Sequence, residues 1–311
     1  MRVGTRINRE VAPGDIKDLA RQADQAGLDE VWIVEDCFYT GGIATAATVL
    51  AVTETITVGI GVLPTVARNP AIAAMEIATL AGLYPGRLTV AFGHGVPAWM
   101  RQIGAYPKSP LAALEETLDV IKRLLSGERV SVEGKHVRLD EVELEHQPPV
   151  VPPLLAGVRG PKSLAVSGRK ADGTILAEPA APEYIRATRE ITGNAITTYN
   201  WFALDEDPAR ARERVRADVA DALGVNSAPH VQPMPFGEEL LAIMESGEDV
   251  ASRLRPEWID QLSVSGTLDA CAERVRQLHE AGSESVILLP LTGESPAESI
   301  AAAGKVKARL G

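Results

Sequence analysis

The 311-residue chain has few cysteines, few aromatic residues and little positive charge. Its two cysteines, Cys37 and Cys271, are too few and too widely spaced for a disulfide framework or a zinc module, so a reducing, cytoplasmic location is expected. The formal net charge of −11 argues against a nucleic-acid partner, because such proteins neutralise phosphates with clustered lysine and arginine. The chain opens without a signal-peptide pattern, and no apolar stretch has the length of a membrane span, so no membrane partner is expected.

The remaining composition is that of an ordinary globular protein, with 45% hydrophobic and 23% charged residues. The length is large for one average domain but lies within the range of single α/β barrels. One hydrophobic core is therefore sufficient, and residues 1–311 are predicted to form a single domain.

A unit of helix, breaker and short apolar strand recurs along the chain. Between Asp15 and Gly27 the apolar residues recur at intervals of three and four, which predicts a helix, and residues 31–34 then form an apolar run. The same order returns from Thr267 to residue 289, with looser copies ending in residues 88–91 and 173–176. Four more apolar runs bring the number of predicted strands to eight: residues 3–7, 57–62, 153–156 and 195–203. The alternation indicates a parallel sheet, either closed or open, and eight units favour a (β/α)8 TIM barrel of the α/β class.

Two segments interrupt this rhythm and are predicted to be insertions. Residues 127–149 alternate around a Glu-Gly turn, which is typical of a surface hairpin. Residues 225–256 are rich in proline, glycine and acidic residues with short helical patches, and we interpret them as a lid or a dimer contact.

Residues that can carry chemistry follow the predicted strands, and in a TIM barrel the carboxyl ends of the strands form the catalytic face. Three of these ends also contain glycines, which allow a ligand to approach the backbone closely. The segments are Glu35-Asp36-Cys37, Gly59 to Pro64 leading to Arg68, Gly93-His94-Gly95, Gly157 to Lys162, and Ala177-Glu178.

Several of these residues have two interpretations on sequence alone. The turn from Gly157 to Pro161 before a helix predicts a phosphate site, but it is equally a tight strand-to-helix turn. Glu35 and Asp36 could form an acid/base pair; since neighbours on a strand point to opposite faces, one of them could instead cap the next helix. His94 suits proton transfer near neutral pH, although a lone histidine is more often structural.

The other reactive residue types give weaker signals. No spacing of histidine and acidic residues indicates a metal site. Cys37 has no base beside it in sequence, which favours a small buried residue over a nucleophile. The remaining histidines are expected at the surface: His136, His146, His230 and His279.

Taken together, these segments resemble the bacterial luciferase-like family over nearly the whole chain except residues 225–256. The resemblance rests on motifs in a fixed order, and it is closest to the branch of methylenetetrahydromethanopterin reductase and deazaflavin-dependent glucose-6-phosphate dehydrogenase. That branch uses the deazaflavin coenzyme F-420 (F420), which implies hydride transfer to or from a small organic substrate. The motifs are residues 31–36, 59–64 with 68–70, 78–87, 93–95 and 171–173.

The resemblance also implies roles for individual residues. The acid after the second strand, Glu35, would line the coenzyme site, and a bulge with a non-prolyl cis peptide at Gly61-Val62 would back the coenzyme ring. Where related deazaflavin enzymes often carry histidine after that acid, this chain has Asp36, so proton transfer is assigned to Asp36 or His94. Further coenzyme contacts are expected at Leu63, Gly93, Gly95, Gly157, Val158, Arg159, Gly160 and Pro161, with a substrate pocket at Arg68, Trp99 and Glu178.

The coenzyme tail is polyanionic, so an acidic protein needs local positive charge to bind it. Five basic residues in the loops after the strands could supply this charge, or they could be ordinary solvated surface residues. They are Arg68, Arg101, Lys108, Arg159 and Lys162.

Other functions remain open at this point. The first is an FMN-dependent monooxygenase on the same scaffold, partnered with a separate flavin reductase. The second is a non-redox hydrolase or isomerase that uses Glu35, Asp36 and His94, and the third is a cofactor-binding protein without turnover. Members of this family commonly form homodimers. The alanine-rich residues 43–51 and 71–81 could pack closely across such an interface, or they could pack helices against the barrel.

Overall fold

The computed structural model describes every residue of the chain except residue 225. Its first half contains β1 (Arg2–Ile7), α1 (Ile16–Gln25), β2 (Glu30–Ile33), α2 (Gly42–Val52), β3 (Thr57–Pro64), α3 (Pro70–Leu83), β4 (Leu88–Gly93), α4 (Pro97–Gln102), α5 (Pro110–Leu125), β5 (Val130–Glu133), β6 (Arg138–Val142), β7 (Leu154–Gly157) and α6 (Pro161–Lys170).

The second half contains β8 (Gly173–Leu176), α7 (Pro182–Thr192), β9 (Ala195–Leu204), α8 (Pro208–Ala222), α9 (Ala228–Val231), α10 (Gly237–Ser246), α11 (Val250–Arg253), α12 (Pro256–Leu262), β10 (Val264–Gly266), α13 (Leu268–Glu280), β11 (Ser285–Leu289) and α14 (Pro296–Leu310). Among the described residues, no helix is both long and apolar enough to cross a membrane.

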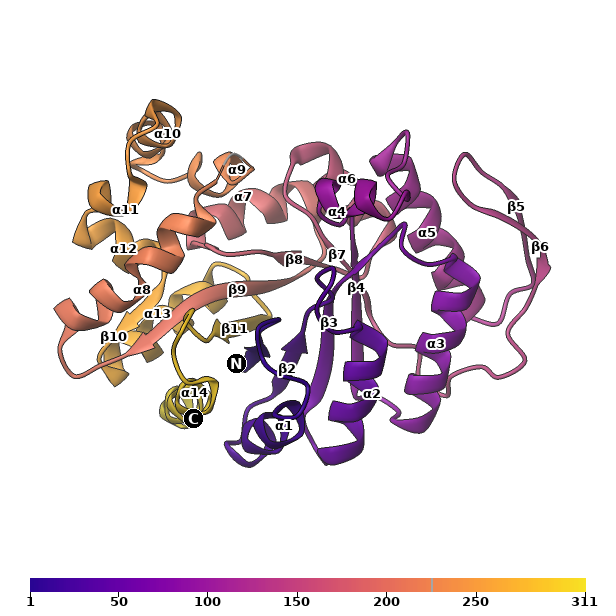
Figure 1. Cartoon of the computed structure of the whole chain (residues 1–311), viewed down its shortest axis with the longest axis horizontal. Coiled ribbons are helices and arrows are strands. Elements are labelled where there is room, and N and C mark those ends of the chain that lie inside the picture. The colour runs from indigo at the N-terminus through magenta and orange to yellow at the C-terminus, as the bar shows by residue number, and fades with distance from the viewer. Residues whose placement is uncertain (225) are drawn as a thin grey trace.

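Eight parallel strands close into a barrel in the order β1, β2, β3, β4, β7, β8, β9 and β11, with β11 returning to β1. These are the eight strands predicted from the apolar runs, so the (β/α)8 fold is confirmed. Helices surround the barrel, and the chain termini lie near each other (Figure 1). A ninth strand, β10, was not predicted; it has three residues and extends the sheet beside the end of β9.

Both interruptions of the barrel rhythm have the predicted secondary structure. β5 and β6 form an antiparallel hairpin between α5 and β7, and residues 225–256 contain the short helices α9, α10 and α11. The two additions lie on opposite sides of the barrel (Figure 1). The interpretation of residues 225–256 as a lid or dimer contact stays a prediction.

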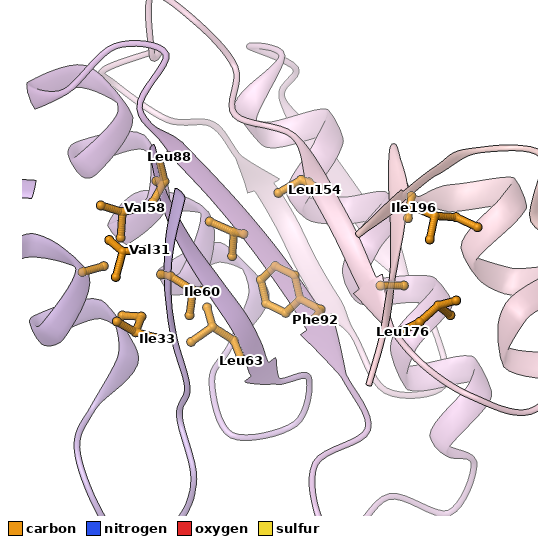
Figure 2. Close-up of a cluster of buried hydrophobic side chains, with 14 of the residues drawn as sticks. Val31, Ile33, Val58, Ile60, Leu63, Leu88, Phe92, Leu154, Leu176 and Ile196 are labelled. Carbon is orange, nitrogen blue, oxygen red and sulfur yellow. The ribbon is translucent and has the colours of Figure 1, made fainter. Parts of the chain in front are cut away.

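The core has two layers because strand side chains alternate between the two faces of the barrel wall. Outward residues such as Val31, Ile60 and Phe92 pack under the surrounding helices (Figure 2). Inward residues form a second cluster that includes Trp32 and Tyr199, and this cluster continues into apolar residues of α8, α10 and α12. The second insertion is therefore packed against the β9 side of the barrel.

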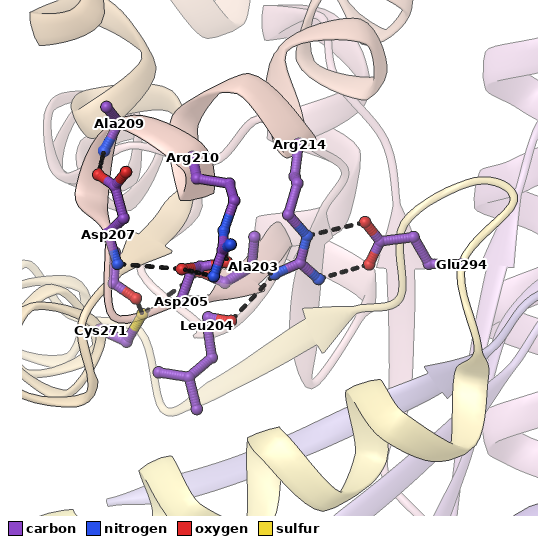
Figure 3. Close-up of polar contacts among 10 residues, drawn as sticks. Ala203, Leu204, Asp205, Asp207, Ala209, Arg210, Arg214, Cys271 and Glu294 are labelled. Carbon is purple, nitrogen blue, oxygen red and sulfur yellow. Dashed lines mark hydrogen bonds and ion pairs between the residues drawn. The ribbon is translucent and has the colours of Figure 1, made fainter.

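A set of ion pairs fixes α8 to the carboxyl ends of β9 and β11. Asp205, just after β9, accepts hydrogen bonds from Arg210, which hold the pKa of its carboxyl at about 2. Arg214 pairs with Glu294 in the loop after β11, with an Nη2–Oε2 distance of 2.6 Å (Figure 3). The start of the long connection from β9 to β11 is thereby fixed beside the open end of the barrel.

Candidate functional site

The carboxyl end of β3 carries the predicted bulge. The pairing of β3 with β4 shifts between Gly61 and Leu63, and the Gly61–Val62 peptide is cis. A Cβ atom on Gly61 would collide with the hydroxyl of Tyr199, so Gly61 faces the packed interior of the barrel. Val62, which is only partly buried, therefore presents the surface at the mouth of the barrel.

Two glycines make room for Val62. A Cβ on Gly93 would lie 2.9 Å from Val62 Cγ2, and one on Gly157 would collide with Val62 Cγ1. Gly95 has a φ of +71°, a conformation that L side chains rarely adopt. The ends of β3, β4 and β7 thus meet in a small platform, defined here as Val62 with its flanking residues Gly93 and Gly157, that has one short apolar side chain at its centre.

The turn after β7 forms a helix start with free donors. Helix α6 begins at Pro161, and its N-cap residue Gly160 provides no side-chain hydrogen bond. The backbone N–H groups of Lys162 and Ser163 therefore have no partner within the helix, and the positive end of the helix dipole points out of the turn. Beside it, Arg159 and Lys162 form no ion pair within the described part of the chain. This is the geometry expected of an anion site.

His94 lies next to this helix start. Its Nε2 is 2.9 Å from Ser163 Oγ, and its Nδ1 is buried. Burial lowers the pKa of His94, so the ring is neutral at neutral pH. The structure therefore joins two predicted coenzyme segments, the β4–α4 turn and the β7–α6 turn, through this histidine.

Glu35 and Asp36 point in different directions, as strand alternation allows. Glu35 Oε2 accepts a hydrogen bond of 2.7 Å from the backbone N–H of Gly42 at the start of α2, and both carboxylate oxygens bond the guanidinium of Arg68. Asp36 Oδ2 lies 3.1 Å from Nη1 of Arg9. Glu35 is thus the residue that caps the next helix, and Asp36 is the more exposed of the two. A role for Glu35 or Arg68 in ligand binding stays a prediction.

A second charged pair lies across the top of the barrel interior. Arg6 Nη1 and Glu178 Oε1 are 3.5 Å apart, and both side chains are largely buried. The Arg6 guanidinium lies over the rings of Tyr199 and Trp201, at 5.5 and 5.7 Å from their centroids. Glu178 therefore has a partner on β1 that the sequence did not indicate, and its part in a substrate pocket stays a prediction.

His230 is a buried histidine close to the end of β8. It was expected at the surface, and that prediction is wrong: the residue is fully buried, stacked on Tyr184 with ring centroids 4.5 Å apart. Its Nδ1 lies 3.0 Å from the carbonyl oxygen of Pro179, beyond the end of β8. Burial, with a smaller contribution from the charge of Arg159, lowers the pKa of His230 to about 4. Since its carbonyl partner only accepts, Nδ1 carries the proton, and the buried Nε2 has no partner among the described residues.

For two other predicted residues, Cys37 and Trp99, no side-chain hydrogen bond to another described residue defines a role. Cys37 is half-buried rather than buried, and burial, together with the charges of Glu35 and Asp36, raises the pKa of its thiol. A nucleophilic thiolate is therefore disfavoured. Trp99 is partly buried on α4, and its part in a substrate pocket stays a prediction.

The structure has two surface cavities. One of about 380 Å³ opens between the β3–α3 loop and the hairpin and is lined by Thr65, Arg68 and His136 among others. The other, of about 420 Å³, lies between α7 and α13 and is lined by Glu183 and Arg274 among others. Within the described part of the chain, no group of three histidine, cysteine or acidic residues could hold a metal ion.

Comparison with known proteins identifies the family. The model of the family described as "Luciferase-like monooxygenase" matches residues 1–285, and the chain belongs to this family. It is 26% identical to the 5,10-methylenetetrahydromethanopterin reductase of Methanolobus tindarius, covering 95% of this chain and 97% of the relative. It is 30% identical to the F420-dependent glucose-6-phosphate dehydrogenase of Nakamurella multipartita, over 91% of this chain and 88% of the relative.

Solved structures agree on the fold. The coenzyme F420-dependent tetrahydromethanopterin reductase of Methanopyrus kandleri superposes with a TM-score of 0.80 at 20% identity, covering 97% of both chains. An F420-dependent secondary alcohol dehydrogenase, solved with an F420-acetone adduct, gives a TM-score of 0.79 at 21% identity and covers 100% of this chain and 99% of its own. At these identities the likeness concerns the fold.

Proposed function

We propose that this protein is an oxidoreductase that transfers hydride between the deazaflavin coenzyme F420 and a small organic substrate at the mouth of the barrel. The observation that carries the proposal is the platform of Val62, Gly93 and Gly157 beside the unpaired helix start of α6. The names of the relatives support it, because the reductases and dehydrogenases that match most of this chain include F420-dependent enzymes.

The residues present fit the coenzyme. A flat ring needs a surface without long side chains, which Val62 and its flanking glycines provide. A phosphate needs free N–H donors and positive charge, which the N-terminus of α6 and Arg159 provide. When bound, the deazaflavin supplies a carbon that gives or accepts hydride, while the protein supplies binding and orientation.

Arg101, Lys108 and Lys162 extend the positive charge around this helix start. None of them forms an ion pair within the described residues, and Arg101 stacks on Tyr106 with its guanidinium 4.3 Å from the ring centroid. We assign the anionic tail of the coenzyme to this side of the mouth.

Proton transfer is assigned to Asp36. Its carboxylate lies on the β1–β2 side of the mouth, is partly exposed, and keeps one oxygen free of the ion pair with Arg9. His94 lies on the other side, bonded to Ser163 of α6. We therefore assign His94 to holding the tail-binding turn in place, and Asp36 to taking or giving the substrate proton.

Parallel fluorescence titrations of the purified protein with F420 and with FMN test the proposal. We expect saturable quenching with F420 and much weaker binding of FMN. Tight binding of FMN alone would favour the monooxygenase alternative, and binding of neither would favour a non-redox barrel.

We also propose that the protein is cytoplasmic, because both of its cysteines are free thiols, as expected in a reducing compartment.

We further propose that the protein forms a homodimer. Helix α3 exposes Ile72 and Met75, which are 48% and 50% accessible and lie three residues apart on one face. A second copy of the chain would bury this apolar face.

A further inference from the structure

We propose that the substrate of this site is an uncharged, largely apolar molecule, bound on the β1–β2 side of the mouth against Phe38 and Tyr39, and not an anion such as a sugar phosphate. This inference rests on the proposed function, since it assigns the substrate class of the same site. It separates this chain from the glucose-6-phosphate dehydrogenases that it resembles in sequence.

The first observation is that charges on the β1–β3 side of the mouth neutralise each other. Glu35 pairs with Arg68, whose Nε also lies 3.2 Å from Glu76, and Asp36 pairs with Arg9. An anionic substrate would have to displace a carboxylate from one of these arginines. Breaking such a partly buried pair leaves an uncompensated charge, which costs free energy.

The second observation concerns where unpaired cations lie. In the loops that follow the barrel strands, within the described residues, the lysines and arginines without a carboxylate partner are on the β4 and β7 sides: Arg101, Lys108, Arg159 and Lys162. The loops after β2, β8 and β11 contain no lysine or arginine at residues 34–41, 177–181 and 290–295. Unpaired positive charge thus lies where the coenzyme tail is assigned. The described loops on the substrate side provide no unpaired lysine or arginine that could bind a phosphate.

The third observation is an aromatic surface at the end of β2. Phe38 and Tyr39 are 68% and 54% exposed, in a chain with only four phenylalanines and five tyrosines. Arg9 lies 5.2 Å from the centroid of the Tyr39 ring, so the same arginine that neutralises Asp36 also holds Tyr39 at the mouth. An apolar ligand would cover this surface and gain the free energy of burying it.

Side chains inside the barrel also combine an aromatic ring with a neutralised charge. The ring of Trp201 is buried beneath Arg6, and its indole N–H has no partner among the described residues. The positive charge of Arg6 is balanced by Glu178. A neutral oxygen, as in a ketone or an alcohol, can accept a hydrogen bond from this indole N–H without adding net charge.

Matched ligands test the proposal on the F420-loaded protein. The uncharged set is a series of cyclic ketones of rising size with their alcohols; the charged set is 4-oxocyclohexanecarboxylate and glucose 6-phosphate. Binding is measured as the rise in Tm and as the change in fluorescence of bound F420. We expect at least one uncharged ligand to bind about tenfold or more tightly than the carboxylate of the same ring size. Equal or tighter binding of the charged ligands, or no binding by any uncharged ligand, would overturn the proposal.

Two variants locate the binding surface. Phe38→Ala and Tyr39→Ala should each lower the affinity for the uncharged ligands about fivefold or more while F420 affinity stays unchanged. Ile191→Ala, an exposed apolar residue on α7, is the matched control and should change neither. If the two variants alter the oligomeric state instead of ligand binding, the surface is an interface and the proposal is wrong. Failure of F420 to bind at all would instead overturn the proposed function, so the two failures are distinguishable.

Discussion

The carboxylate of Glu35 meets the guanidinium of Arg68 at two points, with N–O distances of 2.5 and 2.7 Å, although the residues are 33 positions apart in the chain. Glu35 also accepts a hydrogen bond from the backbone N–H of Gly42, the first residue of α2. One carboxylate therefore joins the end of β2, the start of α2 and the β3–α3 loop.

Arg68→Met should destabilise the protein, because the Glu35 carboxyl group would lose its guanidinium partner in a place where only 11% of its side chain is exposed. We expect the free energy of unfolding to fall by about 2 kcal/mol. Glu35→Gln, which can still accept from Gly42, should cost less. The control is Arg129→Met, which removes the more exposed pair with Glu143 and should change stability by no more than about 0.5 kcal/mol in a denaturant titration.

Asp36→Asn and His94→Gln separate the two proton-transfer candidates. Asp36→Asn should lower kcat by about 100-fold and leave F420 affinity unchanged, because general acid–base catalysis contributes on this scale. His94→Gln should weaken F420 binding with a smaller effect on kcat. Steady-state kinetics with an identified substrate and F420 titrations make the comparison, and the reverse pattern would transfer the proton role to His94.

Arg159→Gln should weaken F420 binding about tenfold by removing a charge-assisted contact to the tail. The salt dependence of binding should become shallower, because less charge is screened. Arg169→Gln is the control, since Arg169 lies at the other end of α6 and pairs with Glu115. Equal affinities of the Arg159 variant and the wild type at low salt would remove Arg159 from the coenzyme site.

His230 makes stability depend on pH in a defined window. Its folded pKa of about 4 lies below the ordinary value of 6.5, so between these values the unfolded chain binds a proton that the folded chain does not. The contribution of His230 to the free energy of unfolding is fully present above about pH 6.5. It declines as the pH falls toward 4, by about 3 kcal/mol at most. His230→Phe keeps an aromatic ring against Tyr184 and should flatten this part of the profile. His146→Gln changes an exposed histidine and should leave the profile as in the wild type.

Met75→Glu should weaken the proposed dimer by placing a charge in the apolar face of α3. Sedimentation at several protein concentrations should show a larger monomer fraction for this variant than for the wild type. Ile191→Glu changes a similarly exposed apolar residue on α7 and should not shift the equilibrium. A wild type that sediments as a monomer at all concentrations would contradict the proposed dimer.

The barrel could be predicted from the sequence because its strands are buried on both faces and therefore appear as short apolar runs between helix breakers. β10 escaped prediction because three residues are too few to show a pattern. The bulge at Gly61-Val62 is present where the family resemblance placed it.

The site was less predictable because its side chains meet across long stretches of sequence. The partners of Glu35, Asp36 and Glu178 are arginines in other barrel units, and nothing local specifies them. His230 was misplaced for a similar reason. It lies in a polar, proline-containing segment typical of the surface, but the fold of that segment carries it against Tyr184 and the end of β8. The role of Gly61 was also open on sequence alone: its Cβ position faces the hydroxyl of Tyr199, and a contact with the coenzyme stays a prediction.

A crystal structure of the complex with F420 tests the central claim most directly. The account predicts the deazaflavin ring on Val62, between the ends of β3, β4 and β7, with its phosphate at the start of α6 near Arg159. A ring bound elsewhere on the protein, or a tail directed toward Phe38 and Tyr39, would contradict it.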